Sequence, residues 1–436
     1  MDMDIEVQLE EISPVRKKVT IEVPAQDASR EFQKILTQYK RMAALPGFRR
    51  GKAPVGLIKR QFKKDIEDEL YQKLIPPALK EAFEQKELHP LGEPELDDLR
   101  YQEGQPLVFS ARLEVLPEVR LPVYKGLEVN APSLEVRDQD LDQELERLRD
   151  QNSSLIAVEG QAVDDGDFAV IDLKGYHQAG GSGPASPEAE IQEDGMVVQV
   201  GDEQTPPALT RALIGMEAGQ EETFQVEYPA DYADKKLAGR QIEYRIKVLE
   251  VKVKELPLLN DDFAMDLGLE SLQELRAKVR QQLEAQRSQN REHEAKNALA
   301  QKMLEGVSLD VPEILLQQQI DQKIRQIAYN MAGQGVDPAK APLDWASVRR
   351  DLRPEAENDV RFQLLLTEVA RAEDLSAGDE EVHQEILQIA QATGEPVEKV
   401  NQRMQKGAGI EDLRSRLERR KALGLIYDSA QIGEQG

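Results

Sequence analysis

The sequence predicts a multidomain α+β protein: an α/β amino-terminal domain, a small antiparallel β domain and an all-α carboxy-terminal domain with extended arms. Three observations predict this order. Alternating strands and an amphipathic helix come first, short strands punctuated by glycine run from about residue 164 to 253, and helical periodicity continues from about residue 257 onward. The 436 residues also exceed one ordinary core, because domains typically hold about 100–200 residues.

The composition favours a solvated, helix-rich protein without cysteine chemistry. Charged residues make up 32% of the chain and aromatic residues only 5%. Zero cysteines exclude disulfides, thiolate catalysis and cysteine metal sites. The acidic start, Met1 to Asp4, lacks the basic region of a secretory signal, and no apolar run approaches the roughly 20 residues that span a bilayer. We therefore expect a soluble, cytoplasmic protein.

The first segment has the pattern of an α+β domain. Residues 5–12 and 15–23 alternate apolar and polar, which predicts two strands joined at Ser13-Pro14. Residues 54–83 predict a further helical stretch and residues 107–116 a long strand, before Pro117 and Pro122 mark a boundary. Between the first two strands and residue 54, one helix is predicted by apolar residues at three- and four-residue spacing: Ala28, Phe32, Ile35, Leu36, Tyr39 and Met42.

The middle segment predicts a small antiparallel domain. Strands are expected at 168–173, 196–200, 223–228 and 242–253, with one short helix at 209–214. Residues 179–187 are rich in glycine, serine and proline, which predicts a mobile flap or loop within the domain.

The last segment predicts helices only. Ser271 to Glu274 match a capping box that opens an amphipathic helix. Residues 284–298 offer only alanine as an apolar residue, so this stretch cannot lie against a large core and predicts an extended arm. Further helices are expected to begin near Pro312, Pro342, Glu355, Asp379, Pro396 and Glu411.

One segment reverses the charge of the chain. The net charge is −26, which argues against nucleic acid as a partner for most of the surface. Residues 39–64 nevertheless hold nine basic residues and no acidic one: Lys40, Arg41, Arg49, Arg50, Lys52, Lys59, Arg60, Lys63 and Lys64. A concentrated cationic patch on an anionic body predicts docking to one particular anionic surface.

A short loop lies within this basic segment. It reads Gly47-Phe48-Arg49-Arg50-Gly51-Lys52-Ala53-Pro54. Glycines at both ends permit a tight turn and the proline fixes its exit, so the phenylalanine and the arginine pair can point outward. Phenylalanine supplies apolar contact area and arginine pairs with phosphate or carboxylate. A merely solvated loop is the alternative from composition alone.

The loop resembles the ribosome-docking signature G-F-R-x-G-x-x-P of bacterial trigger factors at every defined position. The resemblance also covers the order of parts over essentially the full length: docking domain, FKBP-like domain and helical carboxy-terminal domain. It implies domains at residues 1–118 (ribosome binding), 119–157 (a linker strand and helix packing with the carboxy-terminal domain), 158–253 (FKBP-like) and 254–436 (helical chaperone domain).

The resemblance implies an ATP-independent chaperone without a cofactor or metal that binds nascent polypeptides at the ribosomal exit tunnel. It also implies roles in folding, protein export and cell division, and a possible homodimer off the ribosome. The large ribosomal subunit would be contacted through a ribosomal protein and adjacent RNA. The implied ribosome-binding residues are Gly47, Phe48, Arg49, Arg50, Gly51, Lys52 and Pro54, with Lys59, Arg60, Lys63 and Lys64 adding phosphate contacts.

The resemblance also implies a peptidyl-prolyl cis-trans isomerase, with a pocket that departs from the family pattern. Where the family reads I-D-F-T-G this chain reads Ile171 to Gly175 with leucine in place of the aromatic residue, and M-I-P-G-F is replaced by Thr205 to Leu209. A shallow aliphatic pocket grips proline less well than an aromatic one, so we expect weak activity, or residues that only pack the domain. The candidate pocket residues are Leu173, Met196, Leu209, Tyr232 and Tyr244.

Two other functional classes stay open on the sequence. The chain could act mainly as a prolyl isomerase, or it could bind RNA in general through the basic segment. The four histidines stand at no metal-ligand spacing, and no glycine loop with a following Lys-Ser/Thr is present to cradle a nucleotide phosphate.

Overall fold

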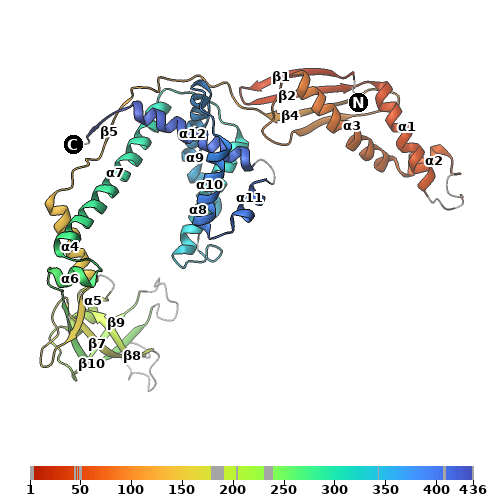
Figure 1. The fold of residues 1–436 in the computed structure, drawn as a ribbon. Helices are drawn as coiled ribbons and strands as arrows, with labels where there is room; N and C mark the ends of the chain where they lie inside the picture. The colour runs from red at the N-terminus through yellow and green to blue at the C-terminus, as the bar shows by residue number, and fades with distance from the viewer. Residues whose placement is uncertain are drawn as a thin grey trace. The chain divides into compact units, whose positions relative to one another are not determined.

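The computed structural model describes residues 4–43, 46, 48, 52–177, 191–202, 205–229, 239–341, 343–405 and 409–434 (Figure 1). Contacts between Cα atoms divide the chain into two compact units. One unit joins Met1–Pro132 to Glu292–Gly436, and the other is Ser133–Arg291. Each unit is described by itself below.

The amino-terminal part is a four-stranded antiparallel sheet covered by helices on one face. Its strand order is β1-β2-β4-β3, formed by β1 (Glu6–Ser13), β2 (Arg16–Val23), β3 (Glu95–Arg100) and β4 (Leu107–Glu114). Alternate residues of the two central strands are fully buried, because side chains along a strand point to opposite faces. The buried members are Val19, Ile21 and Val23 of β2 and Leu107, Phe109 and Ala111 of β4.

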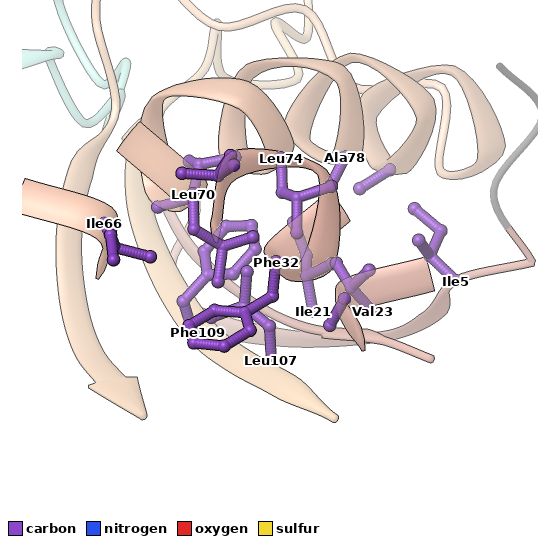
Figure 2. Packing of buried hydrophobic residues seen from close by; sticks show 14 of the residues in the cluster. Ile5, Ile21, Val23, Phe32, Ile66, Leu70, Leu74, Ala78, Leu107 and Phe109 are labelled. Carbon is purple, nitrogen blue, oxygen red and sulfur yellow. The ribbon is translucent and has the colours of Figure 1, made fainter. Parts of the chain in front are cut away.

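Helices α1 (Ala25–Met42) and α3 (Lys63–Gln85) supply the other half of this core (Figure 2). The predicted stripe of α1 is confirmed at Ala28, Phe32, Ile35 and Leu36, all of which are buried. Met42 was expected in the same stripe and is 61% exposed. The core ends one turn earlier, where Tyr39 of α1 is packed against it.

The expected helical stretch 54–83 is two helices. Helix α2 (Val55–Gln61) ends at Phe62, whose φ of −113° and ψ of 26° lie outside the helical range, and α3 then starts at Lys63. The ring of Phe62 packs on Tyr39 with 5.6 Å between centroids. The packing of Phe62 against α1 therefore interrupts the helix, although the residues on both sides of it share one apolar pattern.

The helical part of the same unit contains α8 (Glu313–Gly333), α9 (Trp345–Ala372), α10 (Asp379–Thr393), α11 (Val397–Gln405) and α12 (Gly409–Ser429). A separate helix was expected to begin near Glu355, which is wrong, because α9 continues through Pro354. The linker at 119–157 was expected to hold a strand, but the parallel pairing of β5 (Glu128–Ala131) with β11 (Gln431–Glu434) was not expected. It brings Val129 into a core formed with α9 and α12.

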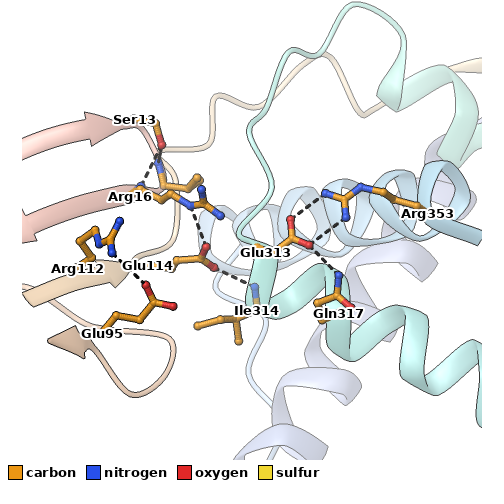
Figure 3. Close-up of polar contacts among 10 residues, drawn as sticks. Ser13, Arg16, Glu95, Arg112, Glu114, Glu313, Ile314, Gln317 and Arg353 are labelled. Atoms are coloured by element: carbon orange, nitrogen blue, oxygen red, sulfur yellow. Dashed lines mark hydrogen bonds and ion pairs between the residues drawn. The ribbon is translucent and has the colours of Figure 1, made fainter. Parts of the chain in front are cut away.

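Helix α8 begins against the amino-terminal sheet (Figure 3). The N–H of Ile314 donates a hydrogen bond to Glu114 Oε2 at 2.9 Å, and Arg16 Nε donates to Glu114 Oε1 at 3.1 Å. Pro312 occupies the N-cap position and has no side chain that accepts a hydrogen bond. Glu114 therefore provides the cap from β4, where the positive end of the helix dipole also favours its charge.

The first turn of α8 also makes polar contacts with α9. Arg353 of α9 donates two hydrogen bonds to Glu313, at 3.0 and 2.8 Å (Figure 3). These hydrogen bonds lower the pKa of Glu313 below its ordinary value. A paired arginine and carboxylate in this fork geometry fix the orientation of the two helices more strongly than a single contact would.

The unit Ser133–Arg291 contains the antiparallel β domain. The long strand β10 (Gln241–Glu255) pairs along one edge with β7 (Phe168–His177), which pairs in turn with β8 (Ile191–Gln199). The other edge of β10 pairs with β9 (Glu221–Glu227) and then with β6 (Ser154–Ala157). Helix α5 (Pro207–Leu213) buries Leu209 and Leu213 in the core of this sheet.

A smaller core lies in the same unit. Leu141 and Leu145 of α4 (Asp138–Gln151) pack with Phe263 of α6 (Asp261–Asp266) and with Leu275 and Val279 of α7 (Leu272–Leu304). Ser271 accepts a hydrogen bond from the N–H of Glu274 at 3.3 Å, which confirms half of the expected capping box. The expected polar stretch of α7, residues 284–298, is exposed or partly exposed except at Ala295, which is buried.

Candidate functional site

The basic loop lies between α1 and α2. Phe48 is 42% exposed, and Lys52 and Pro54 are also exposed. Ala53 is buried in the amino-terminal core, so the exit of the loop is anchored there. Four of the expected docking residues, Gly47, Arg49, Arg50 and Gly51, lie outside the described residues.

Exposed apolar side chains flank Phe48 in the sequence. Met42 ends α1 with 61% of its surface exposed, and Val55 and Leu57 of α2 are also exposed. These residues were not expected in the docking surface, because a helical apolar pattern normally indicates burial. Ile58 alone anchors α2 in the core, which leaves the remaining apolar residues of this short helix outside. Large exposed apolar residues near one another are typical of a protein-binding surface.

The basic residues of α2 and α3 are only partly neutralised. Lys59 forms an ion pair with Glu103, which precedes β4, and Lys63 lies 3.8 Å from Glu67 in its own helix. Arg60 is exposed and has no ion pair with any residue that the structure describes. The segment can therefore still attract an anion.

Three of the expected isomerase residues lie together in the core of the β domain. Leu173 of β7, Met196 of β8 and Leu209 of α5 belong to one hydrophobic core, with Leu209 buried and the other two partly buried against it. Tyr244 of β10 is also buried and pairs with Gly175 of β7. Tyr232 lies outside the described residues.

Two aromatic residues beside Tyr244 were missed from the sequence. The ring of Phe224 stacks on Tyr244 with 5.4 Å between centroids and an interplanar angle of 20°. The hydroxyl groups of Tyr228 and Tyr244 lie 2.8 Å apart, within hydrogen-bonding distance. The register of β9 against β10 places Phe224 opposite Tyr244. The sequence does not show which register two strands adopt, so this neighbour could not be predicted.

Gly175 leaves the space that the ring of Tyr244 occupies. A Cβ atom at residue 175 would lie 2.9 Å from Cε1 of Tyr244 and 3.2 Å from side-chain atoms of both Ile191 and Ile242. Because these distances are too short for ordinary packing, only glycine allows the ring to lie across β7. The glycine of the family pattern therefore has a steric reason in this chain.

Asp172 fixes the irregular pairing of β7 with β8. Its Oδ1 atom accepts a hydrogen bond from the N–H of Gly195 at 2.8 Å, and Gly195 has a φ of +67°, which favours glycine. The register of the two strands shifts between Ile171 and Leu173 at this point. The bulge sets the positions of Leu173 and Met196, which face the core.

The chemistry available to this cluster is apolar binding. Rotation about a prolyl peptide bond needs no nucleophile or metal, and an apolar surface favours the less dipolar twisted amide. No group of three or more histidine, aspartate or glutamate residues that could hold a metal ion occurs among the described residues. Within the same residues, none of the helices is both long enough and apolar enough to cross a membrane.

Comparisons with known proteins agree with this arrangement. The family model described as bacterial trigger factor protein matches residues 5–148, its carboxy-terminal counterpart matches 271–428, and the model of FKBP-type peptidyl-prolyl cis-trans isomerase matches 159–254. The trigger factor of Solibacter usitatus is 33% identical and covers 95% of this chain and 97% of its own length. That of Anaeromyxobacter dehalogenans is 33% identical and covers 98% of this chain and 100% of its own.

A solved structure has the same fold. The structure titled "Promiscuous Substrate Recognition in Folding and Assembly Activities of the Trigger Factor Chaperone" aligns with a TM-score of 0.55 at 18% identity, covering 97% of this chain and 99% of that one. The fold therefore agrees with the family that the sequence relatives indicate. The chain belongs to the trigger factor family of chaperones and carries an FKBP-type peptidyl-prolyl cis-trans isomerase domain at residues 159–254.

Proposed function

We propose that this chaperone works at the ribosome, in the cytoplasm, where it binds nascent polypeptides at the exit tunnel without ATP. The observation that carries the proposal is the exposed ring of Phe48 between the exposed apolar residues of α1 and α2, within the basic segment. An apolar centre with a cationic surround suits a partner that presents protein beside RNA phosphate. The docking residues are Gly47, Phe48, Arg49, Arg50, Gly51, Lys52 and Pro54.

The same proposal divides the chain by task. Residues 1–118 dock, residues 119–157 link, residues 158–253 bind proline and residues 254–436 bind clients. The linker is supported by Tyr124, whose hydroxyl donates a hydrogen bond to Glu373 at 2.6 Å, and by Lys125, which pairs with the same carboxylate at 2.7 Å. Off the ribosome, we propose that the chain can form a homodimer.

Replacing Phe48, Arg49 and Arg50 together by alanine is expected to weaken binding to large ribosomal subunits by about tenfold or more, because central aromatic and arginine residues usually dominate an interface. Co-sedimentation with purified large subunits at moderate salt measures the change. A matched control replaces Leu9, Lys17 and Lys18 of the amino-terminal sheet, which changes the same classes of residue elsewhere. Equal pelleting of the loop variant and the wild type would contradict docking through this loop.

Client binding is proposed for exposed apolar residues at the end of α8 and in the segment before α9. Tyr329 is 76% exposed, and Val336 and Leu343 are also exposed. Scattered apolar contacts of this kind hold an unfolded chain without requiring a particular sequence, and several weak sites add up through avidity.

Changing Tyr329, Val336 and Leu343 to serine is expected to reduce suppression of aggregation by roughly twofold or more, since one of several weak contacts is lost. Light scattering of a chemically denatured client during refolding measures this. The control changes Leu96 and Leu99, which are exposed on β3, to serine. Identical suppression by the three-residue variant and this control would remove the α8 end from the client surface.

The isomerase domain supports a second task for the same chain. We propose Leu173, Met196, Leu209, Tyr232 and Tyr244 as the proline pocket, with Phe224 stacked behind Tyr244. Because three of these side chains are aliphatic, the pocket should grip proline weakly and give modest activity. If acceleration of proline-limited refolding greatly exceeded the suppression of aggregation, the chain would be chiefly an isomerase. Equal affinity for naked RNA and for large subunits would instead favour a general RNA-binding protein.

A further inference from the structure

A cavity of about 440 Å³ lies beside α2 and the start of α3 in the amino-terminal domain. It is lined at its base by Phe32, Ile66 and Tyr101 and at its rim by basic and acidic residues of α2, α3 and the turn before β4. The rim residues are Lys59, Arg60, Lys63, Glu67 and Glu103, with Gly56 and Gln102 completing the lining. None of these residues has been given a part in proline or client binding.

Tyr101 leaves a polar group without a partner in this cavity. Among the described residues, its hydroxyl is the one buried side-chain nitrogen or oxygen atom that lacks a hydrogen-bond partner. Burial raises the pKa of Tyr101 to about 12, and the nearby carboxylate of Glu103 makes a smaller contribution in the same direction. The phenol therefore keeps its proton at neutral pH. An unpaired buried donor is unfavourable, and a ligand with an acceptor atom would remove that cost.

The basic residues around Tyr101 are loosely held. Lys59 lies over the ring of Phe32 at 5.5 Å and pairs with Glu103, whose side chain is 46% exposed. Lys63 is 75% exposed and 3.8 Å from Glu67, a distance at which the attraction is weak in water. Arg60 has no ion pair with a described residue. Three cations and one phenol donor thus line a space that also holds two carboxylates, those of Glu67 and Glu103, in partly exposed ion pairs.

We propose that this cavity is a phosphate subsite for RNA. A backbone phosphodiester enters between Arg60 and Lys63, replaces the carboxylate of Glu103 on Lys59 and accepts a hydrogen bond from Tyr101. The inference rests on the proposed docking at the ribosome and specifies its RNA contact. A phosphodiester fits better than a protein carboxylate because the oxygens of its tetrahedral phosphate point in different directions, so that the cations and the phenol can approach from several sides, whereas both oxygens of a carboxylate lie in one plane. Glu103 then acts as a built-in competitor that keeps affinity for stray RNA low.

Gly56 permits a test that fills the cavity without changing its charge. A Cβ atom built at this residue meets no other atom within 4 Å, so a larger side chain can be accommodated without strain. Gly56→Leu is expected to weaken binding of a short fluorescein-labelled single-stranded RNA by about tenfold, as judged by fluorescence anisotropy with the full chain. The matched control is Thr37→Leu, which adds a leucine at an exposed residue of α1 outside the cavity lining and is expected to bind as the wild type does.

Two further variants separate the subsite from general damage to the fold. Glu103→Gln is expected to tighten RNA binding about threefold, because Lys59 is released, and misfolding does not produce tighter binding. Tyr101→Phe is expected to stabilise the domain against urea while weakening RNA binding, since the same hydroxyl is a cost in the free protein and a donor in the complex. A purely structural tyrosine would not shift the two quantities in opposite directions.

The dependence of RNA affinity on salt concentration measures how many phosphates the protein contacts. Arg60→Gln with Lys63→Gln is expected to lower the slope of log affinity against log salt by about 1.4, from about 0.7 for each phosphate neutralised on a single strand. The control, Lys17→Gln with Lys18→Gln, removes the same charge from the amino-terminal sheet outside the cavity lining and should leave the slope unchanged. Inorganic phosphate should compete only weakly; competition as strong as that of RNA would assign the cavity to a free phosphate compound instead.

The outcomes distinguish this inference from the proposed function. If the wild type pellets with large subunits but Gly56→Leu and Thr37→Leu bind RNA equally, or Glu103→Gln fails to tighten binding, the phosphate subsite is wrong and ribosome docking stands. If the wild type binds RNA with the expected response to the cavity variants but does not pellet with ribosomes, the subsite stands and the proposed docking is wrong.

Discussion

Phe109→Ala is expected to destabilise the amino-terminal domain by about 3–5 kcal/mol, which is the largest effect of any single substitution considered for this chain. Phe109 lies in the centre of β4, fully buried, opposite Ile21 of β2 and beneath α1 and α3 (Figure 2). Removing its ring loses the free energy of burial and leaves a cavity that the surrounding strands cannot fully close. Since domains are typically stable by only about 5–15 kcal/mol, much of the margin would be lost.

Hydrogen exchange read by mass spectrometry measures this loss one segment at a time. Amides of β2 and β4 are expected to lose protection, while amides of β10 in the other compact unit keep theirs. Leu96→Ala provides the control, because Leu96 lies on β3 of the same sheet and is 47% exposed. Undiminished protection of β2 and β4 in Phe109→Ala would show that this core does not hold the docking domain together.

Gly175→Val is expected to lower prolyl isomerase activity by roughly tenfold or more, because overpacking typically costs about 1–3 kcal/mol and here displaces a ring of the proposed pocket. The added side chain meets Tyr244 on one side and Ile191 and Ile242 on the others. Tyr244 cannot then keep both its stack on Phe224 and its contact with the hydroxyl of Tyr228. A proline-limited refolding assay measures the activity.

Two controls isolate the pocket from the rest of the chain. Val197→Ala changes an exposed residue of β8, on the face opposite to Met196, and should leave the activity unchanged. Co-sedimentation of Gly175→Val with large subunits should also equal that of the wild type, because the docking loop is in another domain. Full isomerase activity in Gly175→Val would mean that Tyr244 does not line the proline pocket.

Elements with a local periodic signal could be predicted well. The buried face of α1 and the alternation in β2 follow from the spacing of apolar residues, and the structure confirms both. Elements that depend on a partner strand could not be predicted in this way. Strand β3 has an acidic sequence, Glu95 to Arg100, and exists because β4 pairs with it. Strand β11 is likewise four residues long and is held by β5, about 300 residues earlier in the chain.

Interruptions of helices were the least predictable feature. Pro354 suggested a new helix near Glu355, yet α9 passes through it, with Val360, Leu365 and Val369 burying one continuous face beyond it. Phe62 gave no signal of a break, and a break is present because its ring packs on Tyr39. In both cases, tertiary packing outweighs the local preference of one residue.

The sequence by itself determined the strongly periodic helices and strands, the order of the parts and the place of the basic loop, because these depend on spacing within about 20 residues. Only the tertiary structure decided which side chains meet. Glu114 caps a helix that begins 200 residues later, Phe224 stacks on Tyr244 through strand register, and Glu103 closes a cavity over Tyr101. These pairings follow from the burial of whole faces against one another, and no local pattern in the chain records where a distant face will pack.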